Sequence, residues 1–238
     1  MLLRTLFAWV VGLIVTIIVP LLIIPVAIFD RSGRSGHYLV KIWARIIIFA
    51  CGVSVEVKGA ENLLDDGSQL LTSNHLEAFD IPVLQGFLPA QFRWVSKKNA
   101  FRYPFIGLAM YLSGYIKMDK THPRAAYKSL QKIADKLKEG VSIIIFPEGT
   151  RSKRDSVGEF KRGPFLLAIR TKTPIIPISL RGTERIIERG WPWICPVKVK
   201  IFIDSPVYTD GLKDRDASIL KNDVHEIISR NFEKLSGL

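Results

Sequence analysis

The hydrophobic positions of the first fifty residues form two apolar stretches, separated by a short polar turn at residues 30–36. Residues 6–29 include no charged side chain. As a single helix they would extend roughly 36 Å, which is enough to cross a hydrocarbon core of about 30 Å. Pro20 and Pro25 complicate this prediction, because a helix that ended at Pro20 would reach only about 21 Å. We expect a kinked membrane span or a helix that dips into the bilayer and returns, with a buried core helix as the alternative.

The second apolar stretch, residues 38–51, has a basic stripe along one side. His37, Lys41 and Arg45 recur every four residues and therefore share one face of a helix. This pattern is typical of a helix that lies in the membrane interface and extends its cations to lipid phosphates. An ordinary amphipathic helix on the domain surface is the alternative.

The cations that flank the first stretch predict its orientation. Arg31 and Arg34 follow it, while only Arg4 precedes it. Because basic residues favour the cytoplasmic side of a membrane, the main domain is expected on that face. We divide the chain into a membrane-anchoring two-helix segment at residues 1–53 and a domain at residues 54–238.

Beyond residue 53, short β-type runs alternate with segments of helical periodicity. Strands are predicted at residues 54–57, 69–72, 92–96, 114–117, 141–146, 175–180 and 197–203. Helices are predicted at residues 81–87, 104–112, 124–138, 163–170 and 216–234. Residues 142–146 are apolar almost throughout, as in a central strand that is covered on both faces. The alternation predicts an α/β fold, a mixed β-sheet flanked by helices, with an N-terminal membrane-associated helical hairpin.

Composition narrows the class of partner. Hydrophobic residues make up 48% of the chain and the net charge is +12, so a packed core and an anionic partner are both expected. The candidate partners are phospholipid head groups, phosphorylated substrates and nucleic acid. The sequence has no zinc-finger spacing and no aromatic RNA-binding signature, which makes nucleic acid the weakest candidate. Cys51 and Cys195 are far apart and form no CxxC, so we expect two small core thiols in a reducing compartment.

Candidate chemistry begins where the run at residues 69–72 ends. His75 and Asp80 lie five positions apart, just before Ile81 and Pro82, and proline favours the first turn of a helix. A tight turn there would bring Asp80 to one ring nitrogen of His75 and leave the other nitrogen as a base. A role for Asp80 as an N-cap of the helix is the alternative.

Three further strand ends carry charged residues. Glu148 and Arg151 follow the run at 141–146, Lys97 follows the run at 92–96, and Lys120 follows the run at 114–117. Ligands bind beyond the carboxyl ends of strands in open α/β sheets, so these residues are expected near His75. A base beside fixed cations suits a phosphorylated substrate with a hydroxyl to activate. Residues 147–149 could instead be only a turn, and surface lysines are commonly just solvated.

A metal site is an alternative for the same residues. His75 could share a metal with Glu77, Asp80 or Glu148, but no second His or Cys lies at ligand spacing. We therefore predict no metal.

The chain resembles the glycerolipid acyltransferases, the 1-acyl-sn-glycerol-3-phosphate (lysophosphatidic acid) acyltransferase family. Asn74, His75 and Asp80 match the family's N-H-x4-D block, and residues 146–152 match its F-P-E-G-T-R-S block. Residues 96–98, 104–107 and 114–120 resemble its second block, and residues 160–163 and 173–178 resemble its later blocks. Order and spacing agree from about residue 54 to residue 183, and the two main blocks together are a specific signal.

The resemblance implies that His75 deprotonates the free hydroxyl of a lysophospholipid while Asp80 orients the imidazole. The hydroxyl then attacks an acyl thioester on coenzyme A or acyl carrier protein, so no separate cofactor is expected. Acyl transfer to 1-acyl-glycerol 3-phosphate would give phosphatidic acid for phospholipid biosynthesis. The implied partners are membrane lipids, the lysophospholipid acceptor and the thioester donor.

The resemblance also implies roles for the other residues of these blocks. Arg151, Lys97 and Lys120 would hold the phosphate of the acceptor. Glu148 and Thr150 would fix the glycerol end or brace their loop, and backbone N–H groups near Gly149 would stabilise the oxyanion.

Two positions depart from the family pattern. Glu77 stands where the family commonly has serine, and Lys120 stands where it usually has arginine, which loses a bidentate fork. These departures leave other acceptors open, such as glycerol 3-phosphate, another lysophospholipid or an ornithine-type lipid. A catalytically silent lipid-binding protein and a metallohydrolase are the alternatives from other classes. Lys161 could contact either the substrate or lipid head groups.

Overall fold

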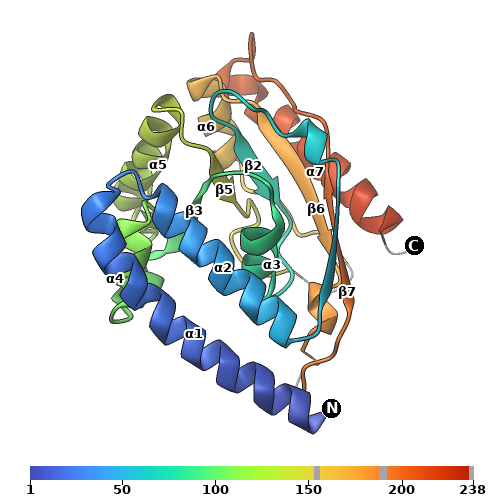
Figure 1. Cartoon of the computed structure of the whole chain (residues 1–238). Helices are drawn as coiled ribbons and strands as arrows, with labels where there is room; N and C mark the ends of the chain where they lie inside the picture. The colour runs from blue at the N-terminus through green and yellow to red at the C-terminus, as the bar shows by residue number, and fades with distance from the viewer. Residues whose placement is uncertain (153–155, 188–191, 236–238) are drawn as a thin grey trace.

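The computed structural model describes residues 1–152, 156–187 and 192–235, and begins with a helical hairpin. Helix α1 (Leu2–Phe29) and helix α2 (Arg34–Ala50) run in opposite directions along one side of the molecule (Figure 1). Helix α1 continues through Pro20 and Pro25, so the possible break at Pro20 does not occur. It is long and apolar enough to cross a membrane by length and composition. Whether it spans or dips stays a prediction.

The side chains of the basic stripe of α2 contact the protein. The His37 side chain is buried, Lys41 Nζ donates to the carbonyl of Leu88 at 2.8 Å, and Arg45 Nε donates to the carbonyl of Gly86 at 2.9 Å. These two cations satisfy carbonyls at the C-terminal end of helix α3 (Asp80–Phe87), where the helix dipole favours positive charge. The prediction of an interfacial stripe is therefore wrong, and the alternative of an amphipathic helix packed on the domain holds.

One mixed sheet organises the rest of the described chain. Its strand order is β1-β7-β6-β2-β5-β3-β4, and all neighbours are parallel except β6 and β7. The strands are β1 (Ser54–Lys58), β2 (Leu70–Ser73), β3 (Arg93–Lys97), β4 (Ile116–Met118), β5 (Ile143–Ile145), β6 (Ile175–Arg181) and β7 (Lys198–Ile203). The predicted strands all form, with ends shifted by one or two residues.

Helices cover both faces of this sheet. The remaining helices are α4 (Ile106–Leu112), α5 (Pro123–Lys138), α6 (Gly163–Thr171) and α7 (Ala217–Lys234). Residues of α2 and α3 pack on one face of the central strands, and residues of α5, α6 and α7 pack on the other. Strand β5 shows why its sequence is apolar throughout, since Ile144 faces the first layer while Ile143 and Ile145 face the second. The predicted fold class is confirmed.

The topology places the candidate site at one edge of the sheet. Strand β2 lies between β5 and β6 and is parallel to both, with Leu70 beside Ile143 and Ile175. The carboxyl ends of β2 and β5 therefore meet at the same edge, and the loops that carry the two main sequence blocks leave the sheet side by side.

Candidate active site

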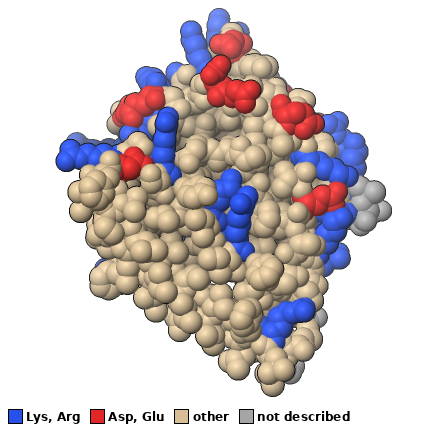
Figure 2. Space-filling model, in the orientation of Figure 1, with Lys and Arg blue, Asp and Glu red and all other residues tan. Residues whose placement is uncertain are grey.

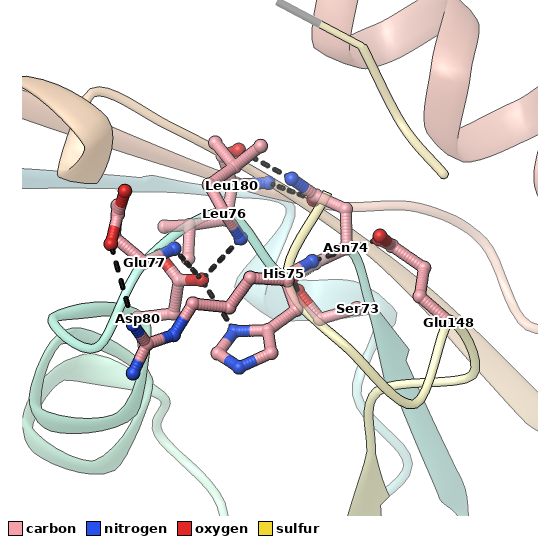
Figure 3. Close-up of polar contacts among 9 residues, drawn as sticks. Ser73, Asn74, His75, Leu76, Glu77, Asp80, Glu148 and Leu180 are labelled. Carbon is pink, nitrogen blue, oxygen red and sulfur yellow. Dashed lines mark hydrogen bonds and ion pairs between the residues drawn. The ribbon is translucent and has the colours of Figure 1, made fainter. Parts of the chain in front are cut away.

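The first loop brings Asp80 back onto His75. Strand β2 ends at Ser73, α3 begins at Asp80, and the carboxylate is fully buried. Its Oδ2 atom lies 2.7 Å from His75 Nδ1 and accepts the backbone N–H groups of Leu76 and Glu77 at 2.6 and 2.9 Å (Figure 3). Because it binds N–H groups that precede the helix, Asp80 does not act as a helix cap. The predicted contact between Asp80 and the imidazole is present.

Two contacts hold the His75 imidazole. Its ring stacks on Phe146 with the ring centroids 4.1 Å apart and the planes 8° from parallel. With Nδ1 donating to the Asp80 carboxylate, the neutral ring carries its free lone pair on Nε2. The side chain remains 15% exposed, so a substrate can reach it.

The second loop fastens the backbone of His75. Glu148 Oε1 accepts the His75 N–H at 2.9 Å (Figure 3), and the Ser152 N–H donates to the His75 carbonyl at 2.8 Å. Both backbone polar groups of His75 are therefore bound by residues more than seventy positions away. Of the two predicted roles for Glu148, this geometry favours bracing the loop.

Glu148 is buried, and among the residues that the structure describes no cation lies in hydrogen-bond contact with its side chain. Its side chain is 4% exposed, and burial raises its pKa to about 7, while the His75 N–H acts in the opposite sense without cancelling the effect. The carboxyl group is thus poised between its neutral and charged forms near pH 7.

Asn74 positions the same loop from the other side, a role that the sequence analysis did not assign. Its side-chain Nδ2 donates to the carbonyl of Leu180 at 2.9 Å, and its Oδ1 accepts the Leu180 N–H at 2.8 Å. The amide is fully buried and ties the end of β2 to β6. A polar amide directly after a buried strand was the available signal.

Lysine side chains gather around Gly149. A methyl group placed on Gly149 would lie 3.2 Å from Lys120 Nζ and 3.3 Å from Lys161 Nζ. Burial, then Lys161 and then Lys97 lower the pKa of Lys120. The three lysines therefore form one cationic group, in which Lys161 joins the two that the sequence analysis selected. The neighbouring Lys98 is instead neutralised by Asp119 at 2.8 Å.

Arg151 lies in a different environment from these lysines. Its Nη1 atom is 3.7 Å from Glu77 Oε2, and its side chain is 55% exposed. Both residues line a cleft of about 830 Å³ whose other walls include Trp9 and Leu13 of α1 and Trp43 of α2. Glu77, which departs from the family pattern, thus contacts the arginine of the F-P-E-G-T-R-S block.

The remaining predictions have mixed outcomes. The Gly149 N–H donates to the Phe146 carbonyl at 3.1 Å within the turn, and the oxyanion role of the backbone N–H groups near Gly149 stays a prediction. Thr150 is exposed, and its role stays a prediction. Among residues 1–152, 156–187 and 192–235, no group of three or more His, Cys, Asp or Glu side chains could hold a metal.

Known proteins are similar to this chain in sequence and in fold. Chloroplastic 1-acyl-sn-glycerol-3-phosphate acyltransferase LPAT1 of Arabidopsis thaliana is 34% identical over 95% of this chain and 64% of its own length. The corresponding BAT2 enzyme of Brassica napus is 36% identical over 77% of this chain and 54% of its own length. The chain therefore spans less than two thirds of these two relatives.

A solved structure and a family model agree with these matches. The crystal structure of the 1-acyl-sn-glycerophosphate (LPA) acyltransferase PlsC from Thermotoga maritima superimposes with a TM-score of 0.84 at 25% identity, covering 100% of this chain and 96% of that one. The sequence model of the acyltransferase family matches residues 54–181, which is more than half of the 238 residues. The chain belongs to the acyltransferase family.

Proposed function

We propose that the chain is a membrane-bound O-acyltransferase that moves a fatty acyl group from an acyl thioester to the free hydroxyl of 1-acyl-glycerol 3-phosphate, forming phosphatidic acid. The contact between His75 Nδ1 and Asp80 Oδ2 at 2.7 Å carries this proposal. It provides an oriented neutral imidazole, which is what activation of an alcohol requires. The names of the relatives support the choice of acceptor.

In the proposed reaction, His75 Nε2 removes the proton of the acceptor hydroxyl while its oxygen attacks the thioester carbonyl. The tetrahedral intermediate collapses by breaking the carbon–sulfur bond, and the imidazolium returns its proton to the leaving thiolate. The buried Asp80 carboxylate stabilises the imidazolium formed in between. The acceptor's own alcohol takes the place of a nucleophilic side chain, so no acyl-enzyme forms.

The lysine group is proposed to bind the acceptor phosphate. Lys97, Lys120 and Lys161 lie together beside the loop that fastens His75. Burial is the largest cause of the lowered pKa of Lys120, and an anion among the lysines would offset the second cause, which is the repulsion by Lys161 and Lys97. Arg151, which lines the apolar cleft, would also bind the phosphate once its ion pair with Glu77 breaks. The position of this cleft between α1, α2 and the His75 loop suits an acyl chain.

Membrane association is proposed to occur through α1, with the catalytic domain on the cytoplasmic face. The support is that α1 leaves most of its apolar side chains exposed, in a family whose substrates are lipids. Coenzyme A and acyl carrier protein both remain candidate donors.

The proposal is tested by His75→Ala in an acyl-transfer assay with labelled thioester and mass-spectrometric product identification. Loss of the general base should lower kcat by about 10²–10⁴-fold. The melting temperature should also fall, because the ring stacks on Phe146 and binds the buried Asp80 carboxylate, so kcat is measured at a temperature where the variant is folded. His122→Ala, which removes an exposed imidazole at the start of α5, is the control. Near-normal turnover of His75→Ala would refute the mechanism.

Glu77 and Lys120 depart from the family pattern, which leaves other acceptor classes open. These are tested in the same assay. The wild-type protein is presented with 1-acyl-glycerol 3-phosphate, glycerol 3-phosphate, another lysophospholipid and an ornithine-type lipid. The highest kcat/KM is expected for 1-acyl-glycerol 3-phosphate, and a higher value for any other acceptor would overturn that assignment. Absence of transfer to every acceptor would favour a silent lipid-binding protein.

A further inference from the structure

Helix α4 and the segment that leads into it expose large apolar side chains on the catalytic domain. Tyr103 is 64% exposed, Phe105 60%, Leu108 47% and Tyr111 72%. These four residues, here called the α4 surface, lie within nine consecutive positions. Scattered exposed apolar residues are ordinary, but a contiguous set indicates a contact with a partner or a membrane.

The opposite side of α4 is attached to the membrane helix. Ala109 is buried in a small cluster with Val19 and Ile23 of α1, and Leu112 packs against that cluster. Figure 1 shows α4 beside α1, close to the turn between α1 and α2. Helix α1 exposes Ile17, Ile18, Leu21 and Leu22 in the same half. The α4 surface therefore continues the exposed apolar surface of α1.

The backbone before α4 is shaped to hold an aromatic side chain outward. Phe105 adopts φ 58° and ψ −48°, which is unfavourable for a bulky residue. Gly107 allows the tight approach, since a Cβ atom there would lie 2.2 Å from the carbonyl oxygen of Phe101. An outlier of this kind at an exposed phenylalanine indicates a use for that side chain outside the fold.

Cations flank the α4 surface. Arg31 and Lys117 line a depression that also contains Leu108 and Tyr111, with Lys132, Lys136, Asp135 and Glu139 at its other side. Figure 2 shows that the broad surface over α1 carries few charges, while the lysines and arginines lie mostly around it. Tyrosine side chains and basic residues beside an apolar area are the arrangement found at the membrane–water interface.

We propose that Tyr103, Phe105, Leu108 and Tyr111 form a second membrane contact and enter the interfacial region of the same leaflet that receives α1. This inference rests on the proposed membrane location of α1. Two contacts, one on the hairpin and one on the domain, fix the orientation of the domain, whereas a single helix would leave it free to rotate. The site edge of the sheet is thereby held in one orientation toward the lipid from which the acceptor comes.

The test uses nitroxide spin labels on the full chain reconstituted in phosphatidylcholine–phosphatidylglycerol vesicles. Cys195→Ser provides the background, because Cys51 is buried and burial raises the pKa of its thiol to about 11, which keeps it unreactive. Single cysteines then replace Phe105 or Tyr111, and Tyr127 and Tyr208, at 56% and 62% exposure, are the matched controls elsewhere on the domain. Ile17→Cys reports on α1. Each variant must retain the helix content and transferase activity of the background.

Labels at residues 105, 111 and 17 should collide more with oxygen than with a water-soluble nickel chelate, and labels at 127 and 208 should do the reverse. If residue 17 is in lipid while 105 and 111 match the controls, the second contact is refuted and the membrane proposal for α1 stands. If residue 17 is also in water, both proposals fail.

Discussion

Replacing Glu148 by glutamine removes a titratable proton but retains the oxygen that accepts the His75 N–H. The wild-type carboxyl is 4% exposed, and burial raises its pKa from 4.5 to about 7. Glutamine has nearly the same size and is neutral at every pH. The substitution therefore separates the charge of Glu148 from its bracing hydrogen bond.

The direction of the effect follows from proton linkage. Because the pKa is raised in the folded state, that state keeps a proton at pH values where the unfolded chain has lost it. The stability contributed by the neutral carboxyl is fully present below about pH 4.5 and is lost as the pH rises to about 7. At about 1.4 kcal/mol for each pH unit, the interval from 4.5 to about 7 corresponds to about 3 kcal/mol.

The assay is the melting temperature in detergent micelles at pH 5 and pH 8, for wild type and Glu148→Gln. For a chain of this size, about 3 kcal/mol corresponds to roughly 6–12 °C. The melting temperature of the wild type should fall between pH 5 and pH 8 by most of this amount more than that of the variant. Comparing the two proteins removes the contribution of the other titrating groups, which both contain. Glu159→Gln, on an exposed side chain, serves as the control and should leave the wild-type pH dependence unchanged.

Identical pH dependence in wild type and Glu148→Gln would refute the reasoning, because the carboxyl would then titrate at its ordinary pKa despite its burial. A variant that is much less stable at both pH values would show instead that the charge is required, which contradicts a neutral bracing group. Greater stability of the variant at pH 8 than at pH 5, relative to wild type, is the expected signature.

Three further substitutions test other parts of the site. Asp80→Asn should lower kcat by about 10²–10⁴-fold with a nearly unchanged KM, measured by initial rates, because the amide cannot stabilise the imidazolium; a changed KM alone would contradict this. Asn74→Ala leaves the buried polar groups of Leu180 unsatisfied and should cost about 3 kcal/mol, seen as a lower melting temperature; an unchanged value would exclude its bracing role. Lys120→Ala should raise KM for the acceptor about tenfold with little change in kcat, whereas the exposed Lys128→Ala should not.

The sequence was informative wherever local pattern and tertiary packing agree. The continuous apolar run at residues 142–146 predicted a central strand, and Ile143, Ile144 and Ile145 indeed face both helical layers. The spacing of His75 and Asp80 predicted their contact, because only a short turn separates a strand end from a helix start. These features depend on neighbours along the chain.

Other features depend on which distant segments pack together. His37, Lys41 and Arg45 were expected to face lipid, but Lys41 and Arg45 find carbonyl acceptors on α3, which helical periodicity alone cannot show. Likewise, the spacing of the blocks could not distinguish Lys161, beside Gly149, from Arg151, which pairs with Glu77. Helical periodicity predicts which residues lie on the same face of a helix, but it does not show what packs against that face.

The site is assembled by groups other than those expected to perform the chemistry. His75 is fixed through its backbone by Glu148 and Ser152, and Asn74 joins the end of β2 to β6. The lysines contribute little to this framework, so their replacement should alter affinities while the fold persists. Replacement of the imidazole, which contacts Asp80 and Phe146, should lower the rate far more than it lowers stability. Replacement of Asn74 should instead alter stability first, and activity only as a consequence. If the polar side chains only happened to lie together, substitutions among them would not divide into those that affect activity and those that affect stability. This division is therefore what is expected of a catalytic site on a rigid support.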